Sequence, residues 1–438
     1  MVDSIVNQTQ PEHLDGVEPV DLPVSPEDQT KLESIDISLE AFHAELDRLE
    51  KLDHFIHSDT GKQSPEMLRY AVEKFGFADA ISTEDITDSA KQVWDRTKYN
   101  LKRFQSDLYG YAKVLQSGND RIVERISMLY DTASNIKDKP YQEEIEIRKN
   151  AKFGIDGKFE PHDIRPVMIQ TQNLLDFYDK VLLPYMAMID KMINNLSFDE
   201  KWTEDATIDF SIFYAKRWLK GALPVENDQR FRVNASVFRS DLTQGNRSIY
   251  FSGPTEAETD KIQDWAFMVN TIRDFRFKYY TVPEQKPVNP EDNKIEVPAS
   301  NQIRQRLGVL MGLAKRLQAR KGYDQKLSAA LRKLEQSADR VRSKAGQIRT
   351  MDNNDPNSPT NRPTEAKNEA RPAVSNVIHD LTMILNNVTR MITDYNNALA
   401  GMIRLISGLA FIADLELKAF QAPLRKPTEE EQKRLAPR

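Results

Sequence analysis

A dense run of basic side chains between residues 301 and 349 is the part of the sequence best suited to a chemical task. The run holds thirteen Lys or Arg residues against three acids, which leaves a charge of +10. Such side chains neutralise phosphates and release the counterions around a nucleic acid, so the contact they make depends on salt. The candidates for DNA-phosphate contact are Arg304, Arg306, Lys315, Arg316, Arg320, Lys321, Arg332, Lys333, Arg340, Arg342 and Lys344.

These bases occur all around the expected helix, which favours electrostatic contact without sequence readout. The alternative is a solvated basic face that pairs with acids elsewhere in the chain. Residues 1–60 supply such acids, because they carry fifteen acids against three bases, a charge of −12. The whole chain is only −6, so charge is sorted along the sequence. Sorting of this kind concerns partners and association rather than fold.

Signatures of enzymes, metals and cofactors are missing. The chain has no Cys, which excludes disulfides, thiolate metal sites and cysteine nucleophiles. No Walker A, HExxH, GxSxG or dinucleotide-binding motif occurs. His54 and His57 stand near Asp53, but no further ligand is nearby, and a solvated helix end explains them better than a metal site. We expect no catalytic residue, cofactor or metal, although one sequence does not reveal a site assembled from distant segments.

The stretch from Arg273 to Tyr280 interleaves bases and aromatic residues, as a binder of single strands does. An amphipathic strand with an aromatic core face explains the same pattern, and we favour it.

The pattern of apolar residues predicts a mainly α fold. We expect an acidic disordered leader, a helical N-terminal part, a small antiparallel β insertion in the middle and a long C-terminal helical bundle. The expected ranges are 1–30 for the leader (a candidate propeptide), 31–222 for the helical domain, 223–283 for a small α+β segment, 284–299 for a Pro-rich linker, 300–422 for the bundle with a loop at 351–372, and 423–438 for a charged tail.

Within the N-terminal two thirds, apolar spacing of three and four predicts helices over 88–116, 119–136, 167–196 and 205–219. The third of these should kink near Pro184. Asp156-Gly157 predicts a hairpin turn, and the alternation after Pro224 predicts strands.

In the C-terminal third, the apolar phase breaks at Lys321-Gly322-Tyr323, which predicts a kink or corner between two helices. The last helix keeps an unbroken heptad over residues 374–413, with a third apolar position in each heptad. That pattern predicts packing against more than one helix, in a bundle that we expect to be antiparallel. The longest apolar run, residues 405–413, is shorter than the roughly 20 residues of a membrane span, so we expect no span. The acidic N-terminus does not look like a signal peptide.

Several segments together give a family resemblance. They are residues 38–46 (SLEAFHAEL), the short predicted helix at 64–76, the helix that contains Trp94 and Phe104, and residues 237–242 and 245–251. Their order over about the first two thirds of the chain resembles the internal head proteins of phiKZ-like giant tailed bacteriophages.

The resemblance implies a non-enzymatic virion protein, made in the host cytoplasm and packaged in the capsid interior. Its expected partners are packaged DNA, bound weakly and without specificity, and other head proteins; no membrane is expected. The resemblance also implies ejection with the genome, and trimming by a prohead protease after a small residue–x–Glu signal. The candidate cleavage sites are Glu18, Glu27 and Glu40. Similar triplets end at Glu66 and Glu84, so the signal arises easily by chance.

A different hypothesis is a helical adaptor that binds a partner protein through the C-terminal bundle. The wide apolar face of residues 374–413 motivates it.

Overall fold

The computed structural model describes most of the chain from Ile86 onward. The described residues are 86–136, 139–147, 150–194, 211, 214–226, 231, 236–253, 265–282, 285–319, 322–352 and 377–421. Outside them lie the predicted leader 1–30, most of the predicted loop 351–372, the tail 423–438, the candidate cleavage sites Glu18, Glu27 and Glu40, and the pair His54 and His57.

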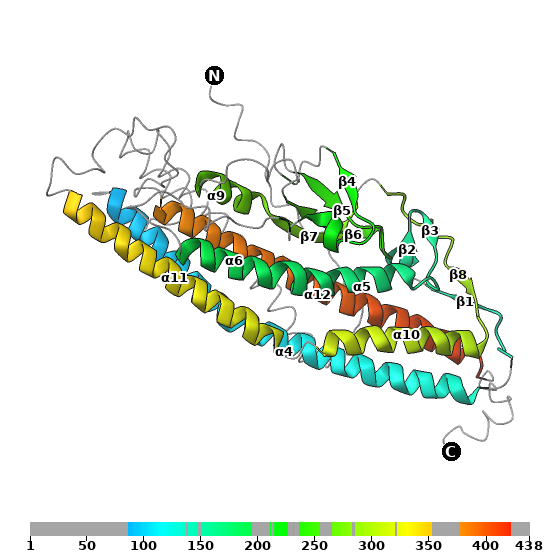
Figure 1. The fold of residues 1–438 in the computed structure, drawn as a ribbon. Coiled ribbons are helices and arrows are strands. Elements are labelled where there is room, and N and C mark those ends of the chain that lie inside the picture. The colour runs from blue at the N-terminus through cyan, green and yellow to red at the C-terminus, as the bar shows by residue number, and fades with distance from the viewer. Residues whose placement is uncertain are drawn as a thin grey trace, which may run out of the picture.

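Four long helical rods run lengthwise through an elongated body (Figure 1). The second rod contains a π-helical turn, and the third is broken once. The mainly helical fold predicted from the sequence is confirmed. In chain order the rods are α4 (Ile86–Asn135), α5 (Arg165–Phe177) with α6 (Leu183–Asn194), α10 (Ser300–Gln318) with α11 (Tyr323–Asp352), and α12 (Val377–Lys418).

The third rod runs antiparallel to the first. Lys98, near the start of α4, pairs with Asp339 in α11, with 2.6 Å between the ammonium nitrogen and a carboxylate oxygen. Ser300, at the start of α10, donates a hydrogen bond of 3.1 Å to the carbonyl of Ile136, just beyond α4. As residue numbers increase along α4, the residue numbers of its contacts in α11 and α10 decrease.

The second rod runs parallel to the third. Arg316 in α10 donates a hydrogen bond to Gln172 in α5, and Arg340 in α11 donates one to Asn194 in α6. Between these contacts the chain advances 22 residues on the second rod and 24 on the third. The two rods therefore stay side by side over their shared length.

The central helix of the bundle is α12. Residues 381–396 are all buried, and α12 packs against α4, α5, α9, α10, α11 and strand β7. Heptad positions such as Leu381, Ile392 and Ile406 are each 0% exposed. The prediction that this helix packs against more than one helix is confirmed. Elements of the same chain bury its apolar face.

By length and composition alone, α12 is also the one described helix that qualifies as a membrane span. The prediction of no span rested on the nine-residue run and overlooked the apolar character of the whole helix. Inside the protein, 72% of its most apolar window is buried. A core helix of a globular bundle has this character, because it is apolar on every side that meets a neighbour.

A four-stranded antiparallel sheet packs on α12 through one of its edge strands (Figure 1). Ile249 and Phe277 are 0% exposed and join the core. The predicted antiparallel insertion is confirmed. In spatial order its strands are β4 (Leu223–Val225), β5 (Val237–Arg239), β6 (Arg247–Ser252) and β7 (Arg276–Thr281), with α9 (Trp265–Asp274) between the last two in the chain.

Two short antiparallel pairs complete the described strands. β2 (Gly154–Ile155) and β3 (Lys158–Phe159) are joined by the predicted turn, where Asp156 and Gly157 have φ angles of 48° and 81°. β8 (Lys294–Glu296) pairs with β1 (Glu144–Glu146), so a strand lies inside the range 284–299 that we expected to be a linker.

Two expected helix boundaries differ in the structure. Where the sequence predicts separate helices over 88–116 and 119–136, α4 is continuous. The facing rod explains this, because the buried Asn119 donates a hydrogen bond of 2.8 Å to the carbonyl of Ala314 instead of capping a new helix. Tertiary contact outweighs the weak local preference of Gly118 for a break. Of the helix expected over 205–219, the described part is α7 (Ala215–Trp218).

The predicted kink near Pro184 takes the form of a π-helical turn. Over Tyr178–Leu182 the backbone widens, and the amide of Leu183 bonds the carbonyl of Tyr178, five residues back. Proline has no amide hydrogen to give to the ladder, and the wider turn accommodates this loss. At the other predicted corner, Gly322 has a φ of 82°, which glycine adopts without strain.

Rods and sheet share one hydrophobic core. The predicted ranges 31–222, 223–283 and 300–422 all contribute to it. Examples from the three ranges are Leu174, Phe251 and Leu385.

Gly401→Ala should destabilise the protein, because a Cβ at this position of α12 would lie 2.9 Å from Cε1 of Tyr279 in β7. The Tyr279 hydroxyl is buried, so the ring has little room to move outward. The same burial raises the pKa of this hydroxyl to about 12. Overpacking costs about 1–3 kcal/mol, more than the gain of up to about 1 kcal/mol from helix propensity.

Gly312→Ala is the matched control, because a Cβ there would meet nothing within 4 Å. It should raise the free energy of unfolding by about 0.5–1 kcal/mol. Urea unfolding of both variants gives the comparison. Stabilisation by both substitutions would contradict the close packing of β7 on α12.

Candidate nucleic-acid interface

The candidate phosphate-binding bases lie in different environments. Arg306 is 7% exposed and Arg342 is half-buried. The side chains of Arg320, Lys321 and Lys344 lie outside the described part of the chain. Exposed side chains belong to Arg304, Lys315, Arg316, Arg332, Lys333 and Arg340.

One group of bases follows the contact between the second and third rods, which we term the α6 seam. Four of its bases, Lys180, Arg316, Lys333 and Arg340, each meet a polar side chain of the second rod. The Arg316 guanidinium meets Gln172. The other contacts are Lys180 Nζ to Asp176 Oδ2 at 3.0 Å, Lys333 Nζ to Asp190 Oδ2 at 2.7 Å, and Arg340 Nη2 to Asn194 Oδ1 at 3.0 Å.

At the α6 seam the acids lie beneath the bases. The Asp190 side chain is 6% exposed, whereas that of its partner Lys333 is 68% exposed. The Asp176 side chain is 12% exposed, whereas that of Lys180 is 58% exposed. Each pair is neutral in sum, but solvent meets mainly the positive partner. The outer surface of the seam is therefore basic.

The buried carboxylate of Asp190 is fully engaged. Ser337 donates a hydrogen bond of 2.6 Å to Oδ1, and Asn194 donates one of 3.1 Å to the same atom. Burial alone would raise the pKa of Asp190, but the bonds from Lys333, Ser337 and Asn194 outweigh it and hold the pKa below its ordinary value. Asp190 therefore stays charged and fixes Lys333 in place.

The contact between α4 and the third rod, termed the α4 seam, has the opposite arrangement. In the pair of Asp95 and Arg342, 3.7 Å apart, the acid is 58% exposed and the base 23%. In the pair of Lys98 and Asp339, the acid is 36% exposed and the base 26%. Acids stand at this surface beside the bases, and they balance its charge.

Two exposed bases of α10 lie on this same side. The Arg304 guanidinium carbon is 5.3 Å from the centre of the Tyr130 ring in α4. Lys315 follows eleven residues later, about three helical turns, and so shares the face of Arg304.

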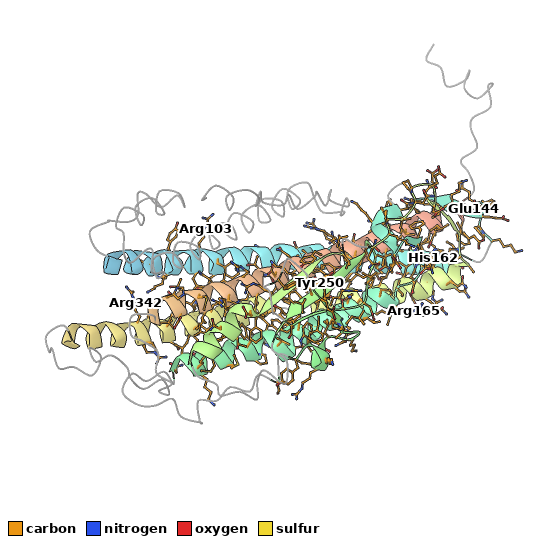
Figure 2. The ribbon with its side chains drawn as sticks, turned by 90° about the horizontal axis from the view of Figure 1, so that it is seen from above. Arg103, Glu144, His162, Arg165, Tyr250 and Arg342 are labelled. Atoms are coloured by element: carbon orange, nitrogen blue, oxygen red, sulfur yellow. The ribbon has the colours of Figure 1, made fainter. Side chains whose placement is uncertain are left out.

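Arg306 belongs to the core. Its guanidinium pairs with Glu416 of α12, whose side chain is 0% exposed. The other oxygen of Glu416 lies 2.7 Å from Nε2 of His162, which Figure 2 labels near the same end of the body as Glu144. A buried, paired guanidinium does not reach a phosphate of DNA, and we leave Arg306 out of the interface.

The stretch from Arg273 to Tyr280 also serves the core. Phe275 and Phe277 are 0% exposed, and Lys278 lies 2.9 Å from Asp394 of α12. Its buried rings do not offer a platform for bases. Among the residues that the structure describes, no group of three or more His, Cys, Asp or Glu side chains could hold a metal ion.

Sequence reasoning missed the layer beneath the seam. Asp176 and Lys180 are four residues apart, the spacing of a helical ion pair. Asp190 and Lys191 are the two charged residues of the stretch from Tyr185 to Ile193, and an acid among so many apolar residues indicates a buried partner. Neither signal identifies Lys333 or Arg340, because those partners are more than 140 residues away.

Comparisons with known proteins give one match. The model of a family described as phiKZ-like phage internal head proteins matches residues 27–415 of the 438. No curated protein and no solved structure matches the chain.

Asp190→Asn should lower the free energy of unfolding at neutral pH by about 1–3 kcal/mol, because it removes charge-assisted hydrogen bonds. Since the pKa of Asp190 is lower in the folded protein than in the unfolded chain, this stabilisation is present above pH ~4 and is lost as pH falls through the folded pKa.

Urea unfolding of wild type and variant should therefore show a large difference at pH 7 that shrinks below pH ~4. Glu124→Gln, at an exposed position of α4, is the control and should change stability by less than about 0.5 kcal/mol. A difference between wild type and Asp190→Asn that does not vary with pH would contradict the role of the carboxylate charge.

Proposed function

The chain belongs to the family of phiKZ-like phage internal head proteins, and from that premise we propose that it is a non-enzymatic component that associates with packaged DNA. As an internal head protein it is a structural protein of the phage head interior. The association is electrostatic and blind to sequence, and the exposed bases of the third rod and its neighbours make it. Other proteins of the head are its further expected partners.

The observation that carries this proposal is the exposure of bases above buried acids. Lys333 and Lys180 remain 68% and 58% exposed although each has an acidic partner. Pairing with internal acids alone does not require basic side chains that are so exposed to solvent. An exposed ammonium group gains counterion-release free energy on meeting a phosphate, whatever the sequence.

Pairing within the chain accounts for two other candidate bases. Arg306 and Arg342 have acidic partners that leave them 7% and 23% exposed. The two explanations that the sequence left open thus apply to different residues. Internal pairing fits these two, and contact with phosphate fits the α6 seam.

The adaptor hypothesis loses its main argument. It rested on the wide apolar face of residues 374–413, and over its described part, from residue 381 onward, the same chain buries that face. We therefore do not carry it forward.

The leader gives the proposal a maturation step. Removal of residues 1–27 would take away six acids and no Lys or Arg, and the formal charge would rise from −6 to 0. A product trimmed by a prohead protease would repel DNA less than its precursor. Such a product could be ejected with the genome.

Gel shifts with the full chain should show weak binding to duplexes of unrelated sequence, with a dissociation constant of about 10⁻⁶–10⁻⁴ M. Affinity should fall steeply between about 50 and 200 mM salt, because each phosphate contact releases counterions. Competitor duplexes of different base composition serve as the control. Absence of binding at the lowest salt would contradict the DNA association.

Mass spectrometry of purified particles should find this protein in the virion, with non-tryptic N-termini just after Glu18, Glu27 or Glu40. Such termini would establish trimming, and Glu66 and Glu84 are internal controls for triplets that occur by chance. An intact N-terminus in the virion would refute the maturation step alone. Absence from the virion would contradict the packaging itself.

A further inference from the structure

We propose that the α6 seam is the surface that meets DNA, and that its ligand is the phosphate backbone of duplex DNA over about one helical turn. The inference rests on the proposed DNA association and adds the face and the form of the nucleic acid. It comes from a difference between the two seams that the net charge of the chain does not reveal.

The two seams differ in the charge of the more exposed member of each ion pair. At the α6 seam the exposed member of each ion pair is the base, as in Lys333 above Asp190. At the α4 seam the more exposed member is the acid, as in Asp95 beside Arg342. A duplex that approached the α4 seam would meet carboxylates beside the bases, and these would offset the attraction. At the α6 seam the carboxylates lie behind the bases.

The bases of the α6 seam form a line. Lys326, Lys333 and Arg340 are seven residues apart along α11, so they share one face of the helix in steps of about 10.5 Å. Arg316 extends the line into α10, and Lys180 adds a base from the second rod. Lys326 is exposed and belongs to the α6 seam by this spacing.

The length of the line fits a turn of duplex. Gln172 and Asn194 mark its two ends on the second rod, 22 residues apart. At 1.5 Å per residue this separation is about 33 Å, close to the roughly 34 Å of one turn of B-DNA. A turn of that length carries about 20 phosphate charges on its two strands, so phosphates outnumber the five bases of the line.

The surroundings favour a duplex over a single strand. Proteins that hold single strands stack the bases on exposed aromatic rings. In the described part of the chain, the most exposed large aromatic side chains are Tyr99 on α4, Tyr141 before β1 and Phe411 on α12. None of these lies on the second or third rod. The α6 seam therefore offers charge without a stacking platform, and a duplex has the higher charge density.

The seam is also held in place before DNA arrives. Lys333 is fixed by Asp190, and Arg340 by Asn194 and Ser337 at 3.0 and 3.1 Å. Side chains that are already ordered lose less conformational entropy on binding. The polar layer of the second rod thus positions the bases.

The test compares two variants of the full chain that lose equal charge. The seam variant is Arg316→Gln/Lys326→Gln/Arg340→Gln, which keeps Lys333 because Asp190 depends on it. The control variant is Lys102→Gln/Arg304→Gln/Lys315→Gln, at exposed positions of α4 and α10 on the α4 side. Thermal unfolding first establishes that both variants fold like wild type.

Fluorescence anisotropy then measures binding to a duplex of about 12 base pairs, a hairpin with a stem of about 6, and a single strand of about 12 nucleotides, over a range of salt. We expect the seam variant to lower the slope of log affinity against log salt by about 2–3, and the control variant by less than about 1. The longer duplex should bind at least about tenfold more tightly than either shorter or single-stranded probe.

Equal losses in the two variants would overturn the seam as the binding face while leaving the DNA association intact. Equal affinity for duplex and single strand would refute the proposal that the ligand is duplex DNA. If wild type binds no probe even at low salt, the DNA association fails, and this inference fails with it.

Discussion

The enclosure of α12 is the constraint on which the rest of the structure depends. A helix with no solvent-facing side over residues 381–396 must have neighbours in every direction, and one layer of helices does not supply them. The other three rods and the sheet together provide the enclosure. One buried polar side chain of α12, Asn387, bonds to two neighbours, because it accepts from the hydroxyl of Tyr185 at 2.9 Å and donates to the carbonyl of Phe275 at 3.1 Å.

This enclosure also explains the distribution of charge. With the apolar faces of the rods turned toward α12, charged side chains collect where adjacent rods meet at the surface. There the burial of each ion-pair partner determines whether the acid or the base is exposed to solvent. Asp190 lies deep and Lys333 lies above it, whereas Asp95 lies outside Arg342. A protein of net charge −6 can therefore carry a basic strip, in which Lys333 and Lys180 cover the carboxylates of Asp190 and Asp176.

Local signals in the sequence predict several elements correctly. The heptad of the last helix, the turn at Asp156-Gly157 and the corner at Gly322 each depend on neighbouring residues, and each is confirmed. Signals that depend on distant partners were not recoverable. Arg304 and Arg306 look alike in the sequence, yet helical periodicity turns the second toward Glu416, 110 residues away.

The same reason accounts for the other differences. The continuity of α4 depends on Ala314 opposite Asn119, and the pairing of β8 depends on β1, some 150 residues earlier. The layer of acids under the α6 seam follows from the parallel alignment of the second and third rods, which apolar periodicity does not specify. The sequence identifies the bases, but the packing of the rods determines which residue each base contacts.

The central position of α12 has a consequence for biosynthesis. In chain order it is the last of the four rods, so the ribosome completes the other three before their common partner exists. Until then the faces of α4, α5 and α10 that pack on α12 lack that partner, and many native contacts join residues far apart in sequence. Folding of such a topology is slow and late, and the unfinished chain exposes surfaces that aggregate. We therefore expect the bundle to close only once α12 has left the ribosome, and a chaperone that covers the apolar faces until then would protect the chain from aggregation.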